Sequence, residues 1–239
     1  MNFHLLKKAA RKIRRTVFDL NAKDNPQIPS AFRRDNTIFV HVPKAAGSTI
    51  NLGLFGYRIG HRSIESFWQT DPAFTGRAFK FSFVRHPYLR FVSAYRYLLK
   101  GGMSSLDAKY SQCYVQEFAS LRSFAEASER ADFRKAIIHL RPQWEFLSLP
   151  ANARYKVSMD YVGKTEFLNE HIDVLSSLAP QTIAARLTAV KEIRLNATQY
   201  SPPEIDTDVF KKIRLIYQDD FEIFGYDEWG TVDECKELW

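Results

Sequence analysis

The stretch Thr37-Ile-Phe-Val-His-Val-Pro-Lys-Ala-Ala-Gly-Ser-Thr49 contains, in order, an apolar run, a turn of small residues and the start of a helical pattern. The β-branched and aromatic run from Thr37 to Val42 ends at Pro43 and predicts a buried strand. The helical pattern after the turn extends to about Phe55. A turn between a strand and a helix directs backbone N–H groups and the positive end of the helix dipole at one point. The stretch therefore predicts an anion-binding site.

The residue types in this turn suit a phosphate group. A lysine offers a mobile positive charge, three small residues let a phosphate approach the backbone, and two hydroxyls follow; these are Lys44, Ala45, Ala46, Gly47, Ser48 and Thr49. In a nucleoside triphosphatase, the lysine directly follows the last glycine of Gly-x-x-x-x-Gly-Lys-Ser/Thr. Here Lys44 precedes Gly47, so that signature is absent. On composition alone, a purely structural turn fits equally well.

A second motif follows a strand predicted over residues 78–84. In Phe83-Val-Arg-His-Pro-Tyr-Leu-Arg-Phe-Val-Ser-Ala-Tyr95, Arg85 ends the strand, and Ser93 lies two turns into a helix predicted from Pro87 to about Lys100. Both side chains can face one ligand, because a guanidinium binds a phosphate through paired donors and a hydroxyl completes its shell. The alternative is that Arg85 pairs with a carboxylate and Ser93 is incidental.

Composition and length indicate a single globular domain. The chain has 239 residues, of which 45% are hydrophobic and 26% charged, as in a folded protein with one well-buried core. We expect a basic arm and linker over residues 1–36 and one domain over residues 37–239, with the linker signals at 21–36. Further elements are predicted as an extended piece from Tyr161 and as helices over 166–178, 180–193 and 206–224.

The net charge of +7 predicts a positive field that attracts phosphate, sulfate or an acidic polymer. Six lysines and arginines lie within residues 7–15. This arm fits either a solvated basic terminus or an amphipathic helix at a membrane surface or on an acidic partner. No window approaches the ~20 apolar residues of a membrane-spanning helix, and no signal peptide is apparent. We expect a cytoplasmic protein, with the inner membrane surface as the alternative location.

Cysteine and histidine usage predicts neither a disulfide framework nor a metal site. Cys113 and Cys235 are only two and lie far apart in the sequence, and no Cys-x-x-Cys or Cys/His cluster occurs. Both cysteines are expected to be inert thiols.

The two motifs together resemble those of sulfotransferases that use 3′-phosphoadenosine 5′-phosphosulfate (PAPS). The turn at 42–49 resembles their 5′-phosphosulfate loop, and residues 84–95 resemble their 3′-phosphate motif, Arg-x-Pro-x-x-Arg-x-x-Ser-x-Tyr. Three later segments resemble the carbohydrate-modifying branch, which includes the heparan and chondroitin sulfotransferases and bacterial relatives: Pro142-Gln-Trp-Glu-Phe-Leu147, Val162-Gly-Lys-Thr-Glu-Phe-Leu168 and Tyr217-Gln-Asp-Asp-Phe-Glu-Ile-Phe-Gly-Tyr226. The resemblance implies a P-loop-like three-layer α/β/α sandwich with a central parallel sheet.

The sequence departs from the family pattern at two places. Ala45-Ala46 stands where Thr-Gly or Thr-Ala is more usual, which removes one hydroxyl contact with the cofactor. His86 stands where Asn or Asp is common, and we expect it to shape the turn beside Arg85.

The resemblance implies transfer of a sulfuryl group from PAPS to a hydroxyl of an acceptor, here a carbohydrate or glycolipid, with no metal. Lys44 would stabilise the charge that grows on the 5′-phosphate leaving group. Arg85 and Ser93 would bind the cofactor at its 3′-phosphate. Relatives often place a lid over that phosphate where Asn196 and Thr198 stand, although a plain turn fits this loop equally well.

The acceptor hydroxyl must lose its proton, and a histidine suits that role. In the glycosaminoglycan 2-O-sulfotransferases the base lies between the two cofactor motifs, in a stretch resembling Gly60-His-Arg-Ser63. His61 is therefore the candidate base, with a surface or packing histidine as the alternative. His41 is expected to pack beneath the phosphate turn. His139 is the reserve base, and the candidate contacts for an acidic acceptor are His139, Arg141 and Gln143.

A basic binding protein without catalysis is the competing hypothesis. Such a protein would bind nucleic acid or an acidic glycan through its charge. The aromatic residues next to arginines from Tyr88 to Tyr97 imitate a stacking platform for bases. Their helical stripe, with Tyr88, Phe91, Tyr95 and Leu98 on one face, is better explained as core, so we expect an enzyme with no nucleic-acid partner. The sequence determines neither the acceptor nor the number of subunits.

Overall fold

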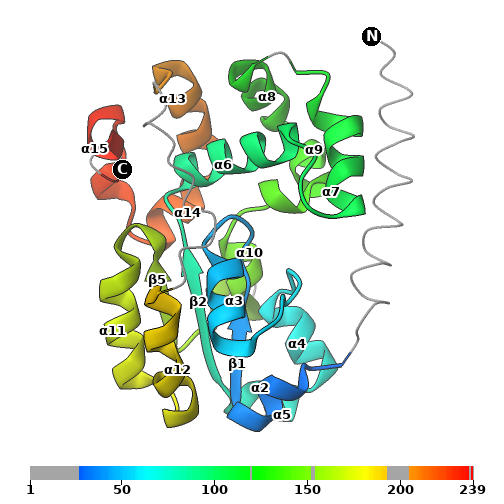
Figure 1. Ribbon diagram of the computed structural model, residues 1–239. Helices are drawn as coiled ribbons and strands as arrows, with labels where there is room; N and C mark the ends of the chain where they lie inside the picture. The colour runs from blue at the N-terminus through cyan, green and yellow to red at the C-terminus, as the bar shows by residue number, and fades with distance from the viewer. Residues whose placement is uncertain (1–26, 119, 152–153, 193–204, 237, 239) are drawn as a thin grey trace. The chain divides into compact units, whose positions relative to one another are not determined.

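A computed structural model of the chain describes residues 27–118, 120–151, 154–192, 205–236 and 238. These residues fall into two compact units (Figure 1). The sheet unit comprises residues 27–85 and 143–192, and the helical unit comprises residues 86–142 and 205–238. Residues 1–26 of the predicted arm and linker lie outside the described residues.

The sheet unit is built on parallel strands that pair in the order β1-β2-β5, namely β1 (Thr37–Val40), β2 (Phe79–Val84) and β5 (Tyr161–Lys164). Val40 pairs with Ser82, and Val84 pairs with Lys164. All of β1 and the last four residues of β2 are buried, because parallel strands are covered on both faces. The register brings the carboxyl ends of the strands to one edge of the sheet. Strands near β1 and β2 were predicted at residues 37–42 and 78–84, and β5 was predicted as an extended piece from Tyr161.

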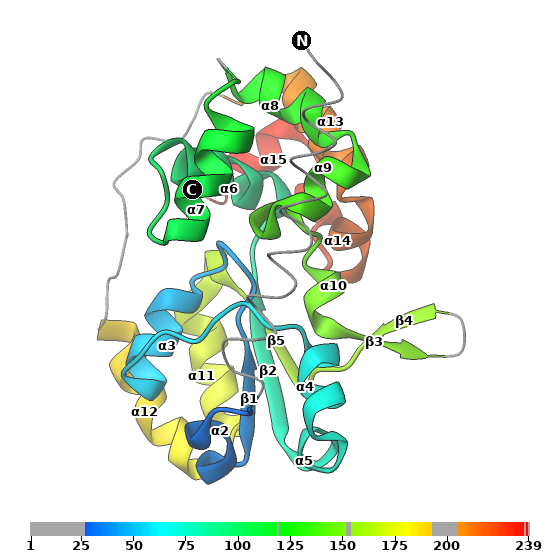
Figure 2. The same ribbon diagram turned by 90° about the vertical axis from the view of Figure 1, so that its right-hand side faces the viewer.

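Helices flank this sheet on both faces, as Figure 2 shows. One face carries α3 (Gly47–Phe55), α11 (Leu168–Leu178) and α12 (Gln181–Glu192), and the other carries α4 (Ile64–Thr70) and α5 (Pro72–Arg77). The unit also contains α2 (Ser30–Asp35), the short helices η3 (Thr165–Phe167) and α10 (Trp144–Leu147), and an antiparallel pair of β3 (Ser148–Ala151) and β4 (Arg154–Val157). The predicted α/β architecture with a central parallel sheet is confirmed.

The end of the segment predicted as a linker forms helix α2 instead. Pro29 is its N-cap residue, and Asn36 ends it in the left-handed conformation with φ of 45°. Phe32 of this helix is fully buried, and its ring centroid lies 5.2 Å from that of Phe55. Proline and serine are typical of helix starts as well as linkers, which explains why the pattern was misleading here.

Arg186 ties three helices of the sheet unit together. Its Nη2 lies 2.6 Å from Asp35 Oδ2 at the end of α2, and its Nη1 donates to the Leu54 carbonyl of α3 at 2.6 Å. Helices α3 and α12 also pack closely at Gly53, where an added Cβ would lie only 2.5 Å from a methyl group of Val190. These contacts fix α3, whose first turn carries the candidate phosphate site.

The helical unit surrounds α6 (Pro87–Leu99). The predicted stripe of Tyr88, Phe91, Tyr95 and Leu98 is buried, which confirms that these aromatic residues form core. The remaining elements of the unit are α7 (Ser105–Tyr110), the π-helical turn η1 (Ser111–Val115), α8 (Leu121–Ser128), α9 (Ala131–Ala136), η2 (Ile138–Leu140), α13 (Thr207–Ile216), α14 (Gln218–Ile223), η4 (Asp227–Trp229) and α15 (Val232–Lys236).

The helix predicted over residues 206–224 is divided in two at Tyr217. This residue leaves the helical conformation, with φ of −115° and ψ of 29°, and separates α13 from α14. Its hydroxyl donates to the Leu140 carbonyl at 2.7 Å in the buried interior. The apolar periodicity continues across the break, so the sequence pattern alone predicts one helix.

Candidate functional site

The predicted phosphate turn lies at the carboxyl edge of the sheet, where open α/β sheets bind their ligands. Lys44 and Ala46 have positive φ angles of 66° and 54°. Residues other than glycine rarely adopt this region, and each costs on the order of 1–3 kcal/mol. Such strained residues persist only where the surrounding fold imposes the conformation, and they are frequent at ligand-binding sites.

Helix α3 begins directly after the turn. The N–H groups of Thr49 and Ile50 donate to the carbonyl of Ala46, the N-cap residue, at 3.0 and 3.2 Å. No acidic residue lies in the first turn of α3, so no carboxylate opposes an anion at the positive end of its dipole. Lys44 and Ser48 are half-buried, while Thr49 is buried.

Gly47 lies against the ring of His41. A Cβ built on Gly47 would lie only 1.8 Å from His41 Cδ2, so no other residue fits without moving the imidazole. His41 is 8% exposed, and its Nδ1–H donates to the Ile59 carbonyl at 2.9 Å. The prediction that His41 packs beneath the turn is confirmed.

His61 lies beside His41. The two ring centroids are 4.1 Å apart, and His61 Nδ1 lies 3.0 Å from the His41 carbonyl. A carbonyl only accepts hydrogen bonds, so Nδ1 of His61 carries a hydrogen, and in the neutral ring Nε2 carries the lone pair. The half-buried His61 thus has the tautomer that a proton acceptor at Nε2 requires.

Arg85 directly follows β2, and a glutamine side chain binds its backbone. The Arg85 N–H donates to Gln143 Oε1 at 2.9 Å, and Gln143 Nε2 donates to the Arg85 carbonyl at 2.8 Å. Gln143 is 0% exposed, whereas Arg85 is half-buried. The sequence had suggested Gln143 as an acceptor contact. The bonds to Arg85 were not foreseen, because Gln143 is distant in the sequence.

Ser93 lies on α6 in the helical unit and is half-buried. Arg85 belongs to the sheet unit, so their joint contact with one phosphate stays a prediction. Asn196 and Thr198 lie outside the described residues, and their role also stays a prediction.

Arg90, the second arginine of the motif, is an interior residue of the helical unit. It is 1% exposed, and its guanidinium donates to the carbonyls of His139 and Arg141 at 3.1 and 2.8 Å. The guanidinium carbon also lies 5.4 Å from the ring centroid of Tyr217. Arg90 therefore stabilises the segment that carries two candidate acceptor contacts.

His139 is buried beside Asp107. It is 4% exposed, and its Nε2 lies 3.6 Å from Asp107 Oδ1. Burial alone would raise the pKa of Asp107, but hydrogen bonds from Tyr97 and Ser104 outweigh this effect, so the pKa of Asp107 lies below its usual value. This surrounding favours a structural role for His139, while Arg141 is half-buried.

His86 holds the C-terminal segment of the helical unit. It is fully buried, its Nε2–H donates to the Trp229 carbonyl at 3.0 Å, and its Nδ1 lies 3.7 Å from Cys235 Sγ. Cys235 is buried as well. The imidazole that departs from the family pattern thus has a packing role within this unit.

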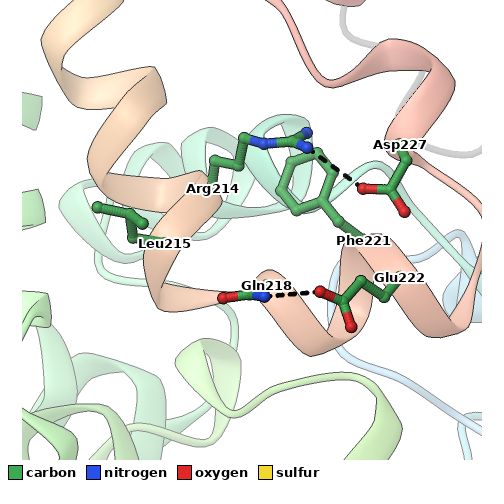
Figure 3. Close-up of a pocket in the computed structure, with 6 residues that line it drawn as sticks. All are labelled: Arg214, Leu215, Gln218, Phe221, Glu222 and Asp227. Carbon is green, nitrogen blue, oxygen red and sulfur yellow. Dashed lines mark hydrogen bonds and ion pairs between the residues drawn. The ribbon is translucent and has the colours of Figure 1, made fainter.

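A small hollow in the helical unit contains none of the predicted site residues. Figure 3 shows its lining on α13, α14 and the chain after them: Arg214, Leu215, Gln218, Phe221, Glu222 and Asp227. Ion pairing of Arg214 with Asp227 at 3.3 Å and a hydrogen bond from Gln218 to Glu222 at 2.6 Å connect polar members of this lining. These polar side chains thus bond to one another, and we assign the hollow no catalytic role.

Comparison with known proteins identifies the family. A family model described as the sulfotransferase family matches residues 31–227. No curated protein and no solved structure is significantly similar to the chain. Within the described residues, no helix is long and apolar enough to cross a membrane, and no cluster of three His, Cys, Asp or Glu side chains could hold a metal ion.

Proposed function

Since this chain belongs to the sulfotransferase family, whose members use PAPS, we propose that it transfers the sulfuryl group of PAPS to a hydroxyl of a carbohydrate acceptor. The observation that carries the proposal is the contact series Gly47, His41 and His61, which supports a histidine base beside a phosphate turn. Family membership itself implies sulfuryl transfer from PAPS.

The turn after β1 fits the 5′ end of this co-substrate. PAPS supplies a sulfuryl group that is bonded through oxygen to the 5′-phosphate. We assign that phosphate to the N–H groups at the start of α3, whose first turn carries no acidic residue. The Lys44 ammonium stabilises the negative charge that grows on the bridging oxygen as the sulfur–oxygen bond breaks.

His61 acts as the general base in this proposal. Its Nε2 removes the proton of the acceptor hydroxyl while the hydroxyl oxygen bonds to sulfur. The proton then resides on His61, the sulfuryl group on the acceptor, and the electron pair of the broken bond on the 5′-phosphate. The hydrogen bond from His61 Nδ1 to the His41 carbonyl keeps the ring in the required tautomer and orientation.

Arg85 binds the 3′-phosphate in this proposal, and a contact of Ser93 with the same phosphate stays a prediction from the family motif. A guanidinium forms paired charge-assisted hydrogen bonds with phosphate oxygens, which makes it selective for this group. The assignment of Asn196 and Thr198 to the same phosphate rests on the family resemblance alone, and a plain turn fits this loop equally well. Family resemblance supports these assignments, together with the position of Arg85 at the carboxyl edge of the sheet.

The carbohydrate acceptor rests on resemblance to the carbohydrate-modifying branch and on the net charge of +7, which favours an acidic saccharide. Arg141 is the retained candidate for an acidic group of the acceptor. Packing also accounts for the glycine in the resembling segment at residues 162–168, because a Cβ on Gly163 would lie 2.5 Å from the Phe83 ring.

Nucleotide binding tests the proposal first. The product nucleotide 3′-phosphoadenosine 5′-phosphate (PAP) should raise the melting temperature more than AMP does, because AMP lacks the 3′-phosphate that Arg85 binds. Arg85→Ala should abolish most of this difference, and Arg77→Ala, which removes an exposed arginine of the same unit, should preserve it. Equal shifts with PAP and AMP in the wild type would contradict the proposal.

Mass spectrometry then tests the transfer itself. With PAPS present, an acidic oligosaccharide should gain the mass of one sulfuryl group, and the wild type should release one PAP for each sulfated product. A protein that binds anionic polymers strongly at low salt, yet sulfates no saccharide and does not distinguish PAP from AMP, would support the non-catalytic alternative instead.

A further inference from the structure

We infer that Gln143 is a positioning residue for Arg85, setting the direction in which the arginine leaves the sheet toward the 3′-phosphate; the inference rests on the proposed function. Both polar groups of the Gln143 amide bond to the Arg85 backbone, at 2.9 Å from N–H to Oε1 and 2.8 Å from Nε2 to the carbonyl. One side chain thereby satisfies both backbone groups of a single residue.

The amide takes the place of a further strand residue. Ladder pairing of β2 with β5 ends at Val84 and Lys164, so Arg85 is the first residue beyond it. In a sheet, a neighbouring strand would supply one acceptor and one donor to this residue. Gln143 supplies the same two groups from its side chain, which continues the extended path of β2 by one residue.

The burial of Gln143 argues against direct contact with an acceptor. The residue is 0% exposed, and glutamine is seldom fully buried. Buried amides require hydrogen-bond partners, and here the Arg85 backbone supplies them. The buried amide thus bonds to the Arg85 backbone through both its oxygen and its nitrogen, while Arg85 itself is half-buried.

Loss of the amide should alter recognition of the 3′-phosphate more than folding. Without Gln143, the backbone of Arg85 loses two hydrogen bonds, and the guanidinium no longer starts from a fixed position. Preorganisation of a charged donor lowers the cost of ordering it when a ligand binds. A buried amide with a merely structural role would instead affect binding of every nucleotide alike.

The experiment measures dissociation constants of PAP and AMP by calorimetry for the wild type, Gln143→Ala and Gln143→Glu. Gln143→Glu keeps the size and an acceptor for the Arg85 N–H but has no donor for its carbonyl when ionised. Gln143→Ala loses both hydrogen bonds and should bind PAP about tenfold more weakly, whereas Gln143→Glu loses only the bond to the carbonyl and should weaken PAP binding by a smaller factor of about threefold or more. AMP binding should change less than about twofold in both variants. The control Gln69→Ala, an exposed glutamine of α4, should change neither constant.

A double-mutant cycle separates positioning from general damage. Since Gln143 acts through Arg85, adding Gln143→Ala to Arg85→Ala should weaken PAP binding no further. Equal weakening of PAP and AMP, or an additive effect in the double variant, would overturn the inference. If the wild type itself binds PAP and AMP equally, the proposed function fails; if the wild type prefers PAP and both Gln143 variants retain that preference, only the inference fails.

Discussion

At the phosphate turn, Gly47 has no room for a side chain because the His41 ring occupies the space. The turn also contains Lys44 and Ala46 with positive φ angles. The sequence predicted which residues form the turn, since small residues and a lysine suit a phosphate. The strained conformation could not be predicted from it, because alanine and lysine ordinarily avoid this region and only the folded surroundings impose it.

Gly47→Ala should disrupt the turn. The added Cβ would overlap the His41 ring, and overpacking of this kind costs about 1–3 kcal/mol of unfolding free energy. We expect weaker PAP binding as well, since relief of the overlap must move the turn or the imidazole. Urea unfolding and calorimetry check both effects. Gly60→Ala is the matched control, because nothing lies within 4 Å of a Cβ at Gly60; equal behaviour of the two variants would refute the argument.

His61→Ala should remove the proposed base. Loss of a general base typically lowers kcat by about 10²–10⁴-fold, while PAP affinity should stay near that of the wild type. Steady-state sulfation assays with a saccharide acceptor measure the first effect, and added imidazole should restore part of the rate. His171→Ala is the control. His171 lies in the same unit and is hydrogen-bonded to the Tyr161 hydroxyl, and we propose no catalytic role for it, so its loss should leave kcat near that of the wild type. Full kcat in His61→Ala would exclude this base.

Among the helices, α12 is held to α2 by the ion pair of half-buried Arg186 with buried Asp35, and the strength of this pair depends on pH. Burial alone would raise the pKa of Asp35. The hydrogen bonds and the positive charges of Arg186 and Arg34 outweigh this effect, so the pKa of Asp35 lies below its ordinary value. A depressed carboxyl pKa means that the stabilisation is present above the unfolded pKa of about 3.9 and is lost as the pH falls through the folded pKa.

Asp35→Asn should therefore destabilise the protein at neutral pH. We expect a loss of about 1–3 kcal/mol in unfolding free energy, because the Arg186 guanidinium loses its charged partner. Urea unfolding at pH 7 measures this loss, and the gap from the wild type should narrow below about pH 4. The control Asp173→Asn breaks an exposed pair with Lys191 and should cost no more than about 0.5 kcal/mol. A gap for Asp35→Asn that persists unchanged in acid would contradict the pH argument.

The predictability of the elements followed their length and periodicity. β1 lies within a continuous β-branched and aromatic run that ends at Pro43, and β2 carries phenylalanine at every second position, so both were predicted as strands. Helices α4 and α5 were not, since each has only six or seven residues and little periodicity. Helix α2 was not predicted because its Pro29-Ser30 start resembles a linker. The break at Tyr217 coincides with a hydrogen bond from its hydroxyl to the Leu140 carbonyl, a contact that no local pattern encodes.

For the whole chain, the order of the motifs was enough to predict the α/β class and the sulfotransferase family, because a strand-to-helix phosphate turn and a later arginine recur in a fixed order. The candidate site was predicted less completely. Gln143 meets Arg85 across 58 residues of sequence, and His139 meets Asp107 in the interior of its unit. Neither pairing leaves a local signal, so the role of either side chain becomes visible only in three dimensions.

The sheet unit is discontinuous in sequence, since residues 86–142 lie between its two parts. During synthesis, β1 and β2 therefore emerge well before β5, which pairs with β2. Translation proceeds at roughly 5–20 residues per second, so the free edge of β2 waits several seconds for its partner. An unpaired strand edge can join another chain. Newly made protein thus passes through an interval of vulnerability to aggregation that the finished sheet no longer shows.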